Sequence, residues 1–409
     1  MNIKFVSMSM FMAFALTFTA CHKSGVYDPD SAKNVSDLKV PEGFDWSMSE
    51  DVSLTITSPV ETSVSVFGDE ECKELLATLP VSTEESTFTL NVKNGTEKLY
   101  VEYYTKVDGS KSVLPVSISA SRAAGTATVI LPEGTGKHDK KQHVIFYPGD
   151  GWGTLFFEDM WPSKGDYDFN DMVASYKIQL YIENSKVAAI MVAARLNALG
   201  GHFPYQLCLQ VDNLLKTEIS DVYDYTESTS SDGKGKYKYE DDAIGDKALF
   251  SFDWQNKMGG EYGNYYNTEK GYKLDNIDKN IVAFIIYLND PRDLDDFTSS
   301  SFNFFIRNTD ENDNREIHLL GYEPTASFAT GYDEMVKKNA SLLSDKEYYR
   351  TSDGFVWGLK IPANVSHAVE KANFLEAYPL FREWVVSGGQ KNPMWYESKV
   401  DEHCITFPK

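Results

Sequence analysis

The chain has 409 residues, with 61 acidic and 39 basic side chains and a formal net charge of -22 at pH 7. An apolar content of 42% argues against a mostly disordered chain, and the length favours two domains. The negative charge argues against binding to a nucleic-acid backbone or an anionic lipid surface, because phosphate binding requires a basic patch.

Residues 1–20 predict an export signal. Lys4 supplies a positive charge, and the apolar run of residues 5–20 is too short to span a bilayer comfortably. Residues 18–21 (FTAC) resemble a bacterial lipobox, in which Cys21 would be acylated and become the first mature residue. The alternative is an ordinary signal peptide followed by an accidental cysteine. We therefore expect an exported protein anchored to the outer membrane by lipid at Cys21, facing the periplasm or the cell surface.

The polar residues 21–39 lack periodicity and predict a flexible tether. Three cysteines remain beyond it, Cys72, Cys208 and Cys404. Their odd number and the lack of Cys-x-x-Cys spacing argue against a disulfide framework.

Residues 40–131 predict a small β-sandwich. Short alternating segments, typical of strands, lie at residues 52–57, 62–67, 86–92, 98–104, 113–119 and 126–131. Turn signals such as Asn94-Gly95 separate them, which favours an immunoglobulin-like arrangement. The polar residues 132–142 predict a linker.

Residues 143–409 predict a larger antiparallel sandwich, jelly-roll-like, with a few peripheral helices, so that the whole chain is expected to be mainly β. Residues 172–183 alternate clearly between apolar and polar side chains. Further strands are predicted at residues 187–196, 205–211, 248–254, 281–288, 301–307 and 317–320. Helices are predicted around 332–342 and over 367–384, the latter broken near Pro379, and residues 220–246 predict an exposed loop.

One segment, residues 165–171 (GDYDFND), alternates oxygen-bearing side chains with aromatic ones. On an extended backbone Asp166, Asp168 and Asn170 would share one side, and Tyr167 and Phe169 the other. Carboxylates about 6 Å apart repel by roughly 3 kcal/mol per pair at an effective dielectric constant near 20. A cation removes this repulsion, and several hard oxygen ligands favour Ca²⁺.

The loop is not an EF-hand, because its sixth position is Asp171 instead of glycine and its twelfth is Lys177 instead of glutamate. The candidate calcium ligands are Asp166, Asp168, Asn170, Asp171, Glu158 and Asp159. The alternative is that these side chains cap turns through backbone N–H groups, or pair with Arg195 or Arg315.

Several motifs together resemble the LruC-type domain, found largely in exported lipoproteins of Bacteroidetes. They are residues 153–162 (GTLFFEDMWP), 164–171 (KGDYDFND), 316–319 (EIHL) with Pro324-Thr325, 377–379 (AYP), 387–389 (SGG) and 395–396 (WY). The resemblance covers residues 147 to 400, and residues 41–46 (PEGFDW) look like the start of the small sandwich that precedes this domain. It implies an exported lipoprotein whose biochemical role is not established. Two positions depart from the family pattern: residues 200–203 (GGHF) stand where Gly-x-Gly-Phe is usual, and Leu320 follows the His-Leu pair where proline is usual.

The motifs of common enzymes are missing: there is no Gly-x-Ser-x-Gly elbow and no His-Glu-x-x-His. His318 is expected to be structural, and we expect no enzyme, although a two-carboxylate glycoside hydrolase stays open. Two hypotheses remain. The first is a surface adhesion or structural lipoprotein rigidified by Ca²⁺. The second is a glycan-binding accessory lipoprotein whose stacking platforms are Trp254, Tyr262, Tyr265 and Tyr266, unless these aromatics pack in the core.

Overall fold

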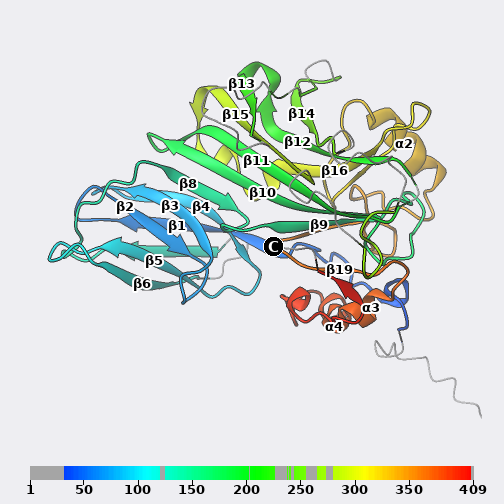
Figure 1. Ribbon diagram of the computed structural model, residues 1–409, viewed down its shortest axis with the longest axis horizontal. Helices are drawn as coiled ribbons and strands as arrows, with labels where there is room; N and C mark the ends of the chain where they lie inside the picture. Colours follow the sequence, from blue (N-terminus) through cyan, green and yellow to red (C-terminus); the bar gives the residue numbers. More distant parts are fainter. Residues whose placement is uncertain are drawn as a thin grey trace, which may run out of the picture.

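The computed structural model describes residues 32–119, 125–201, 203–225, 237, 239–240, 244–254, 265–272 and 280–406. The chain is mainly β, with 43% strand and 11% helix. A small sandwich lies beside a larger one, and the few helices lie on the outside of the larger part (Figure 1). The mainly β prediction is confirmed.

The small sandwich packs a three-stranded sheet against part of a longer one. Its strands are β1 (Ser49–Thr57), β2 (Thr62–Phe67), β3 (Leu75–Val81), β4 (Ser86–Lys93), β5 (Lys98–Tyr104), β6 (Lys111–Ser117) and β7 (Gly125–Ile130). In the three-stranded sheet, β1 pairs antiparallel with β4 and parallel with β7. Val52, Leu54 and Ile56 alternate along β1 and are fully buried, as the period of two requires.

The two parts of the molecule share one sheet. β3 pairs antiparallel with β8 (His143–Tyr147), which continues the order β13-β15-β11-β10-β8-β3-β2-β5-β6 across both sandwiches. The segment predicted as a linker, residues 132–142, is held to the small sandwich: Ser63 N donates to His138 O at 2.7 Å, and Gly136 N to Tyr104 O at 2.7 Å. It is therefore not a free spacer.

The larger part consists of two sheets around an aromatic core. The long sheet contributes β8, β9 (Gly153–Phe157), β10 (Met172–Glu183), β11 (Lys186–Leu199), β13 (Ile219–Asp224), β15 (Ile281–Arg292) and β18 (Gly358–Ile361). The other sheet runs β14 (Lys247–Ser251), β12 (Tyr205–Leu215), β16 (Phe302–Asn308) and β17 (Glu316–His318). Ring contacts join the layers, with Phe284 on β15 4.8 Å from Phe250 on β14 and Tyr176 on β10 5.4 Å from Phe304 on β16.

Most strand predictions in this part match the structure, and β10 has the predicted bounds. The loop prediction for residues 220–246 is wrong at its start, because residues 219–224 form β13 and pair with β15. The sequence of this short strand, ISDVYD, does not alternate between apolar and polar residues, so the period of two that predicts other strands is missing. Ser175, one of the polar residues in the alternation of β10, is fully buried and accepts a hydrogen bond from Arg195, so this face of the strand is not exposed at that point.

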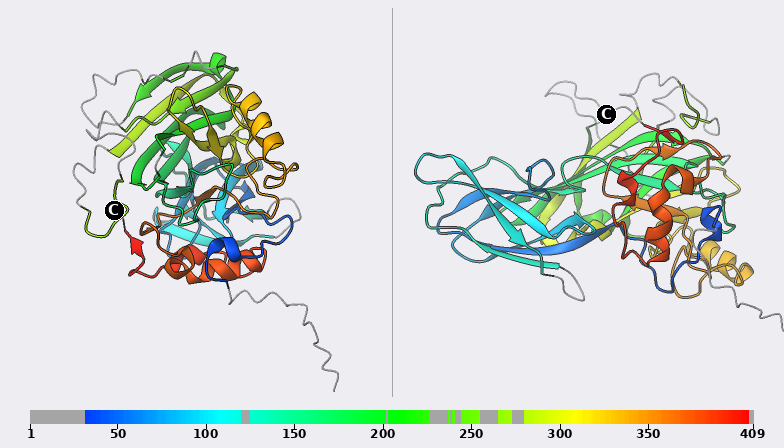
Figure 2. Two further views of the ribbon diagram at one scale, coloured as in Figure 1. Left: turned by 90° about the vertical axis from the view of Figure 1, so that its right-hand side faces the viewer. Right: turned by 90° about the horizontal axis from the view of Figure 1, so that it is seen from below.

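The C-terminal region folds back against the N-terminal segment (Figure 2). It contains β19 (His367–Ala368), α3 (Phe374–Ala377), α4 (Pro379–Val386) and β20 (Cys404–Ile405). The helix α2 (Ala329–Lys338) lies apart from this region and buries Tyr332 in the main core. The helix predicted over residues 367–384 is wrong at its start, because residues 367–368 form β19 and helix begins only at Phe374. Its predicted break is confirmed, since Pro379 begins α4 and Pro lacks the N–H that a continuing helix would need.

The tether prediction is wrong for its last residues. The short 3-10 helix η2 (Val35–Asp37) buries Val35 among apolar residues of the C-terminal region, and Leu38 joins it. Phe44 follows, with its ring 5.0 Å from that of Trp384. Val35 and Leu38 are isolated apolar residues in a polar stretch, so no periodicity indicates that they are buried. They are covered because they join an apolar cluster that also contains Phe374 and Phe381 of the C-terminal region.

Residues 1–31, with Cys21, lie outside the described residues. In the described part of the chain, no helix is both long and apolar enough to cross a membrane. Cys72, Cys208 and Cys404 are free thiols.

Candidate metal centre

The acidic loop, residues 158–171, connects β9 to β10, and the chain reverses direction across it because the two strands pair antiparallel. Tyr167 and Phe169 have φ angles of 57° and 55°, in the left-handed region, so the prediction of an extended backbone is wrong. Bulky residues adopt this region at a cost, which surrounding packing must offset. Both rings are 1% exposed; Tyr167 lies 5.4 Å from Phe355 and Phe169 5.1 Å from Phe374. The predicted separation of aromatic and acidic faces is present, on a different backbone.

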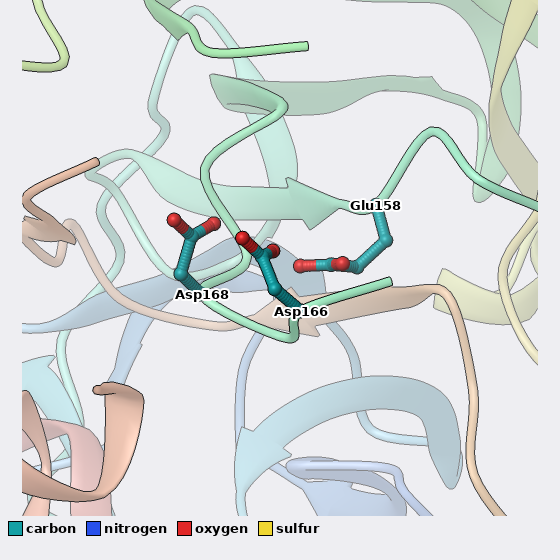
Figure 3. Close-up of side chains that lie close together, drawn as sticks. All are labelled: Glu158, Asp166 and Asp168. Carbon is teal, nitrogen blue, oxygen red and sulfur yellow. The ribbon is translucent and has the colours of Figure 1, made fainter. Parts of the chain in front are cut away.

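Three carboxylates converge on the acidic side of the loop. Glu158, Asp166 and Asp168 each place an oxygen within 4.8 Å of the other two. Figure 3 shows Asp166 and Asp168, from one turn of the loop, facing the carboxylate of Glu158, which directly follows β9. Glu158 and Asp168 are buried and Asp166 is exposed. We call these three residues the acidic centre.

Backbone N–H groups satisfy part of this negative charge. The two oxygens of Glu158 accept from Tyr167 N at 3.1 Å and Phe169 N at 2.7 Å. Asp168 accepts from Lys371 N at 2.8 Å and from Asn170 N at 3.2 Å. The turn-capping interpretation therefore holds for Glu158 and Asp168. It does not account for Asp166, whose carboxylate has no hydrogen bond or ion pair to any residue in the described ranges.

The amide of Asn170 is fully buried beside the acidic centre. Its Nδ2 donates to Asp168 Oδ2 at 2.9 Å and lies 3.3 Å from Ala368 O. Its Oδ1 has no hydrogen-bond partner among the described residues. A buried acceptor without a partner lowers the stability of the fold by about 1–3 kcal/mol, so a cation or water bound at this oxygen would remove that cost.

The other two predicted carboxylate ligands, Asp159 and Asp171, contact each other next to the acidic centre and are not part of it. Asp171 Oδ2 accepts from Asp159 N at 2.8 Å, and the backbone oxygen of Asp171 accepts from Gly200 N and Gly201 N, each at 3.1 Å. The backbone of Asp171 therefore joins the loop to the end of β11, and the Asp159 carboxylate lies beyond that end, with Oδ2 3.4 Å from Phe203 N.

Glu370 is an acidic neighbour that sequence reasoning missed. A Cβ atom added to Gly200 would lie 2.9 Å from Glu370 Oε2 and 2.3 Å from Asn170 Oδ1, so the two oxygens approach the same point. Glu370 is about two hundred residues from the acidic loop and belongs to no motif. The chain contains no signal that could have placed it there.

Burial and mutual repulsion raise the pKa values of these carboxyls. Burial is the main cause for Glu158, whose pKa is well above its ordinary value, and the neighbouring acids add to it. Burial and then the charge of Asp166 raise the pKa of Asp168 to about 7, and burial and then the charge of Asp159 raise that of Asp171 to about 8. The pKa of Glu370 is raised for the same reasons. A bound divalent cation reverses this, because it favours the ionised form.

Glycines make room for the crowded oxygens. A Cβ on Gly165 would lie 1.9 Å from Glu158 Oε2, and one on Gly201 would lie 2.4 Å from Asp159 Oδ2. Neither distance is compatible with a real side chain. Gly200 and Gly201 lie in one of the two places where the sequence departs from the LruC-type pattern. Glycine is required at both positions because oxygen atoms of neighbouring side chains approach their backbone so closely.

The arginines predicted as alternative partners have contacts elsewhere. Arg195 donates to Asn197 Oδ1 at 3.1 Å and to Ser175 Oγ at 3.2 Å. Arg315 binds Asp313 and donates to Trp161 O at 3.0 Å. Although burial opposes it, the pKa of Arg315 is raised, because Asp313 binds the guanidinium and the charge of Asp159 adds to the effect.

The remaining candidate residues take structural positions. His318 is fully buried, with Nδ1 2.9 Å from Asn303 Oδ1 and Nε2 3.0 Å from Glu316 Oε2, as a structural histidine should be. Trp254 is 0% and Tyr266 7% exposed, so both pack in the core and cannot serve as stacking platforms. Tyr265 is exposed, and Tyr262 lies outside the described residues.

No curated protein matches this chain. Among solved structures, a Bacteroides ovatus protein described as a candidate lipoprotein superposes with a TM-score of 0.68 at 22% identity, covering 85% of this chain and 99% of that one. This likeness establishes a shared fold. A family model described as a domain of unknown function (DUF4842) matches residues 185–396, which begin after the acidic loop. The resemblance to LruC-type domains stays a prediction. Since the matched segment covers more than half of the chain, the protein belongs to the DUF4842 family.

Proposed function

We propose that the chain is an exported lipoprotein, held at the outer membrane by lipid on Cys21, and that its larger domain is a non-catalytic binding, adhesion or structural module stabilised by Ca²⁺. The lipobox-like residues 18–21 and the description of the Bacteroides ovatus protein with the same fold support the anchor. One observation carries the calcium proposal: three carboxylate oxygens converge within 4.8 Å, and one belongs to Asp166, which no capping contact explains.

The donor set suits calcium. Ca²⁺ takes six to eight hard oxygens with flexible geometry, whereas Mg²⁺ requires a near-ideal octahedron and releases its waters reluctantly. Glu158, Asp166 and Asp168 would supply the carboxylate oxygens, and Asn170 Oδ1 is a buried acceptor beside them. A hollow of about 270 Å³, lined by Asp166 and Lys371 among others, leads to the exposed side of the acidic centre.

The ion would act as a structural tie. Asp168 already holds the backbone of Lys371, in the segment before α3, and Glu158 holds the acidic loop to the end of β9. A cation shared by these side chains would join the loop, the long sheet and the C-terminal region. Rigidity of this kind suits a module that binds or bears load outside the cell.

The burial of Glu158 supports a non-catalytic role for the acidic centre. A glycoside hydrolase needs one carboxyl group to protonate the leaving group and another to act at the sugar ring. Glu158 is 0% exposed and both its oxygens accept backbone N–H groups. It cannot reach a substrate in this arrangement.

The calcium proposal is tested by thermal unfolding of the mature chain after treatment with a chelator. We expect the melting temperature to rise on addition of about 1 mM Ca²⁺ and to rise less with the same concentration of Mg²⁺. An identical melting temperature with chelator and with Ca²⁺ would refute it.

The anchor is tested separately, by fractionating cells that express the wild type and Cys21→Ser. Lipidation predicts that the wild type sediments with membranes and that the variant loses the acyl mass at its N-terminus. A wild-type protein found entirely in soluble fractions would contradict it.

A further inference from the structure

A second polar site lies between the two sandwiches, away from the acidic centre. It is a cleft of about 470 Å³, within the range of small-molecule sites. One wall comes from the start of β1 and from Asn91 on β4. The other comes from β18, from the 3-10 helix η6 (Ser299–Ser301) and from the turn that follows β17, residues 319–322. The cleft exists only because the shared sheet fixes the sandwiches against each other.

A fixed pair of opposite charges lines the cleft. Lys360 Nζ on β18 donates to Ser299 O at 2.8 Å and Ser299 Oγ at 3.2 Å, so these hydrogen bonds use two of its three protons, and it lies 5.5 Å from the centre of the Tyr176 ring. Asp51 on β1 accepts from Asn91 Nδ2 at 2.8 Å through Oδ1, which leaves Oδ2 free of any contact recorded among the described residues. No ion pair joins Asp51 to Lys360, although each charge acts on the other.

The energetics of this pair favour an occupant between the two groups. Burial lowers the pKa of Lys360 to about 8, and burial raises the pKa of Asp51. Each charged group is thus held partly out of water with neutral hydrogen-bond partners, but without an ion pair to an oppositely charged group. A ligand that accepts from Lys360 and donates to Asp51 would supply both missing contacts.

The rest of the lining indicates which ligand would do so. Ser49, Ser300 and Asn91 add neutral hydroxyl and amide groups, and Trp46, Leu319 and Tyr322 add an apolar wall. Hydroxyl groups both donate and accept, so adjacent hydroxyls of one ring can satisfy a carboxylate and an ammonium together. The apolar wall suits the C–H face of the same ring.

We propose that this cleft binds a neutral carbohydrate, with Asp51 and Lys360 holding adjacent hydroxyl groups of one sugar ring. A free amino acid could also pair with opposite charges, but it would leave the serine hydroxyls and the apolar wall without a role. The site is independent of the proposed calcium centre and shares no residue with it.

The test uses the mature chain, a glycan array, and calorimetry with the best neutral glycan found. Asp51→Asn keeps an oxygen for Asn91 Nδ2 and removes the charge, and Lys360→Met keeps the length and apolar stem of the side chain. We expect each variant to weaken binding about tenfold or more, because each loses a charge-assisted hydrogen bond. The matched controls Asp290→Asn and Lys337→Met, on exposed residues, should bind like the wild type.

Unchanged melting temperatures of Asp51→Asn and Lys360→Met would show that they fold. Asp166→Asn should leave glycan binding intact, which separates this site from the acidic centre. Silence of the wild type across the array, unchanged affinity in both cleft variants, or preferential binding of free amino acids would each overturn the proposal.

Discussion

Asp166→Asn removes a charge from the acidic centre without removing any hydrogen bond to another described residue. It therefore distinguishes a cation site from a set of turn caps. At 4.8 Å, the buried pair Glu158 and Asp168 repel by about 3.5 kcal/mol if both are ionised, at an effective dielectric constant of about 20. Exposed Asp166 adds a smaller repulsion, because solvent screens it.

The expected effect of the variant changes sign with calcium. In chelator, Asp166→Asn should melt at the wild-type temperature or slightly above it, since it relieves repulsion. Calcium at a hundred times its dissociation constant would stabilise the wild type by about 2.7 kcal/mol, a shift on the order of 5 °C. The variant should lose most of this shift, because one of three carboxylate ligands is gone.

The assay is differential scanning fluorimetry of both proteins across a calcium titration, with Asp290→Asn as an exposed control of equal charge change. The control should retain the full calcium shift. If the melting temperatures of Asp166→Asn and the wild type differ by the same amount with and without calcium, the Asp166 side chain affects stability without binding calcium, and the calcium proposal is refuted.

Three further predictions concern other parts of the structure. Gly165→Ala should abolish the calcium shift and lower the melting temperature, because its Cβ would lie 1.9 Å from Glu158 Oε2; Gly134→Ala, with nothing within 4 Å, is the control in the same assay. Burial lowers the pKa of His367 to about 4 from 6.5. As the pH falls, the unfolded chain therefore takes up this proton at a higher pH than the folded chain does. The free energy of unfolding should decrease between about pH 6.5 and about pH 4, by at most about 3 kcal/mol. Urea unfolding of His367→Gln in saturating calcium should show a shallower pH dependence than the wild type, and an equal slope would contradict this. Phe44→Ala should lower the free energy of unfolding in urea by about 3–4 kcal/mol, because the ring is buried against Trp384. The control Val107→Ala, at a residue that is 93% exposed, should lower it by almost nothing. Equal losses of stability in the two variants would contradict the docking of the N-terminal segment.

Most of the strands could be predicted because their side chains alternate between buried and exposed faces with a period of two. β10 is the clearest case: from Tyr176 to Ile182 buried residues alternate with half-buried ones, although all of residues 172–176 are buried. β3 escaped prediction because it is nearly continuous in apolar residues and contains Pro80, a pattern that alternation does not detect. Its pairing with both β2 and β8 makes it the strand that joins the sandwiches.

The acidic centre was predictable in part. Asp166 and Asp168 lie two residues apart, so a local pattern can place them together, and Glu158 is close in sequence. The left-handed backbone of Tyr167 and Phe169 was not predictable, because it is maintained by rings from distant segments and by N–H groups bonded to Glu158.

The sequence by itself predicted the mainly β architecture and the acidic loop with its buried aromatic side, and it displays the pattern typical of an export signal that ends in a lipobox. These depend on short-range periodicity and composition, which a single chain displays directly. Only the tertiary structure placed Glu370 beside Asn170, buried Phe44 against α4, and brought Asp51 and Lys360 into the lining of one cleft between the sandwiches. Such contacts join residues hundreds of positions apart, and they arise from sheet pairing and packing that no local pattern encodes.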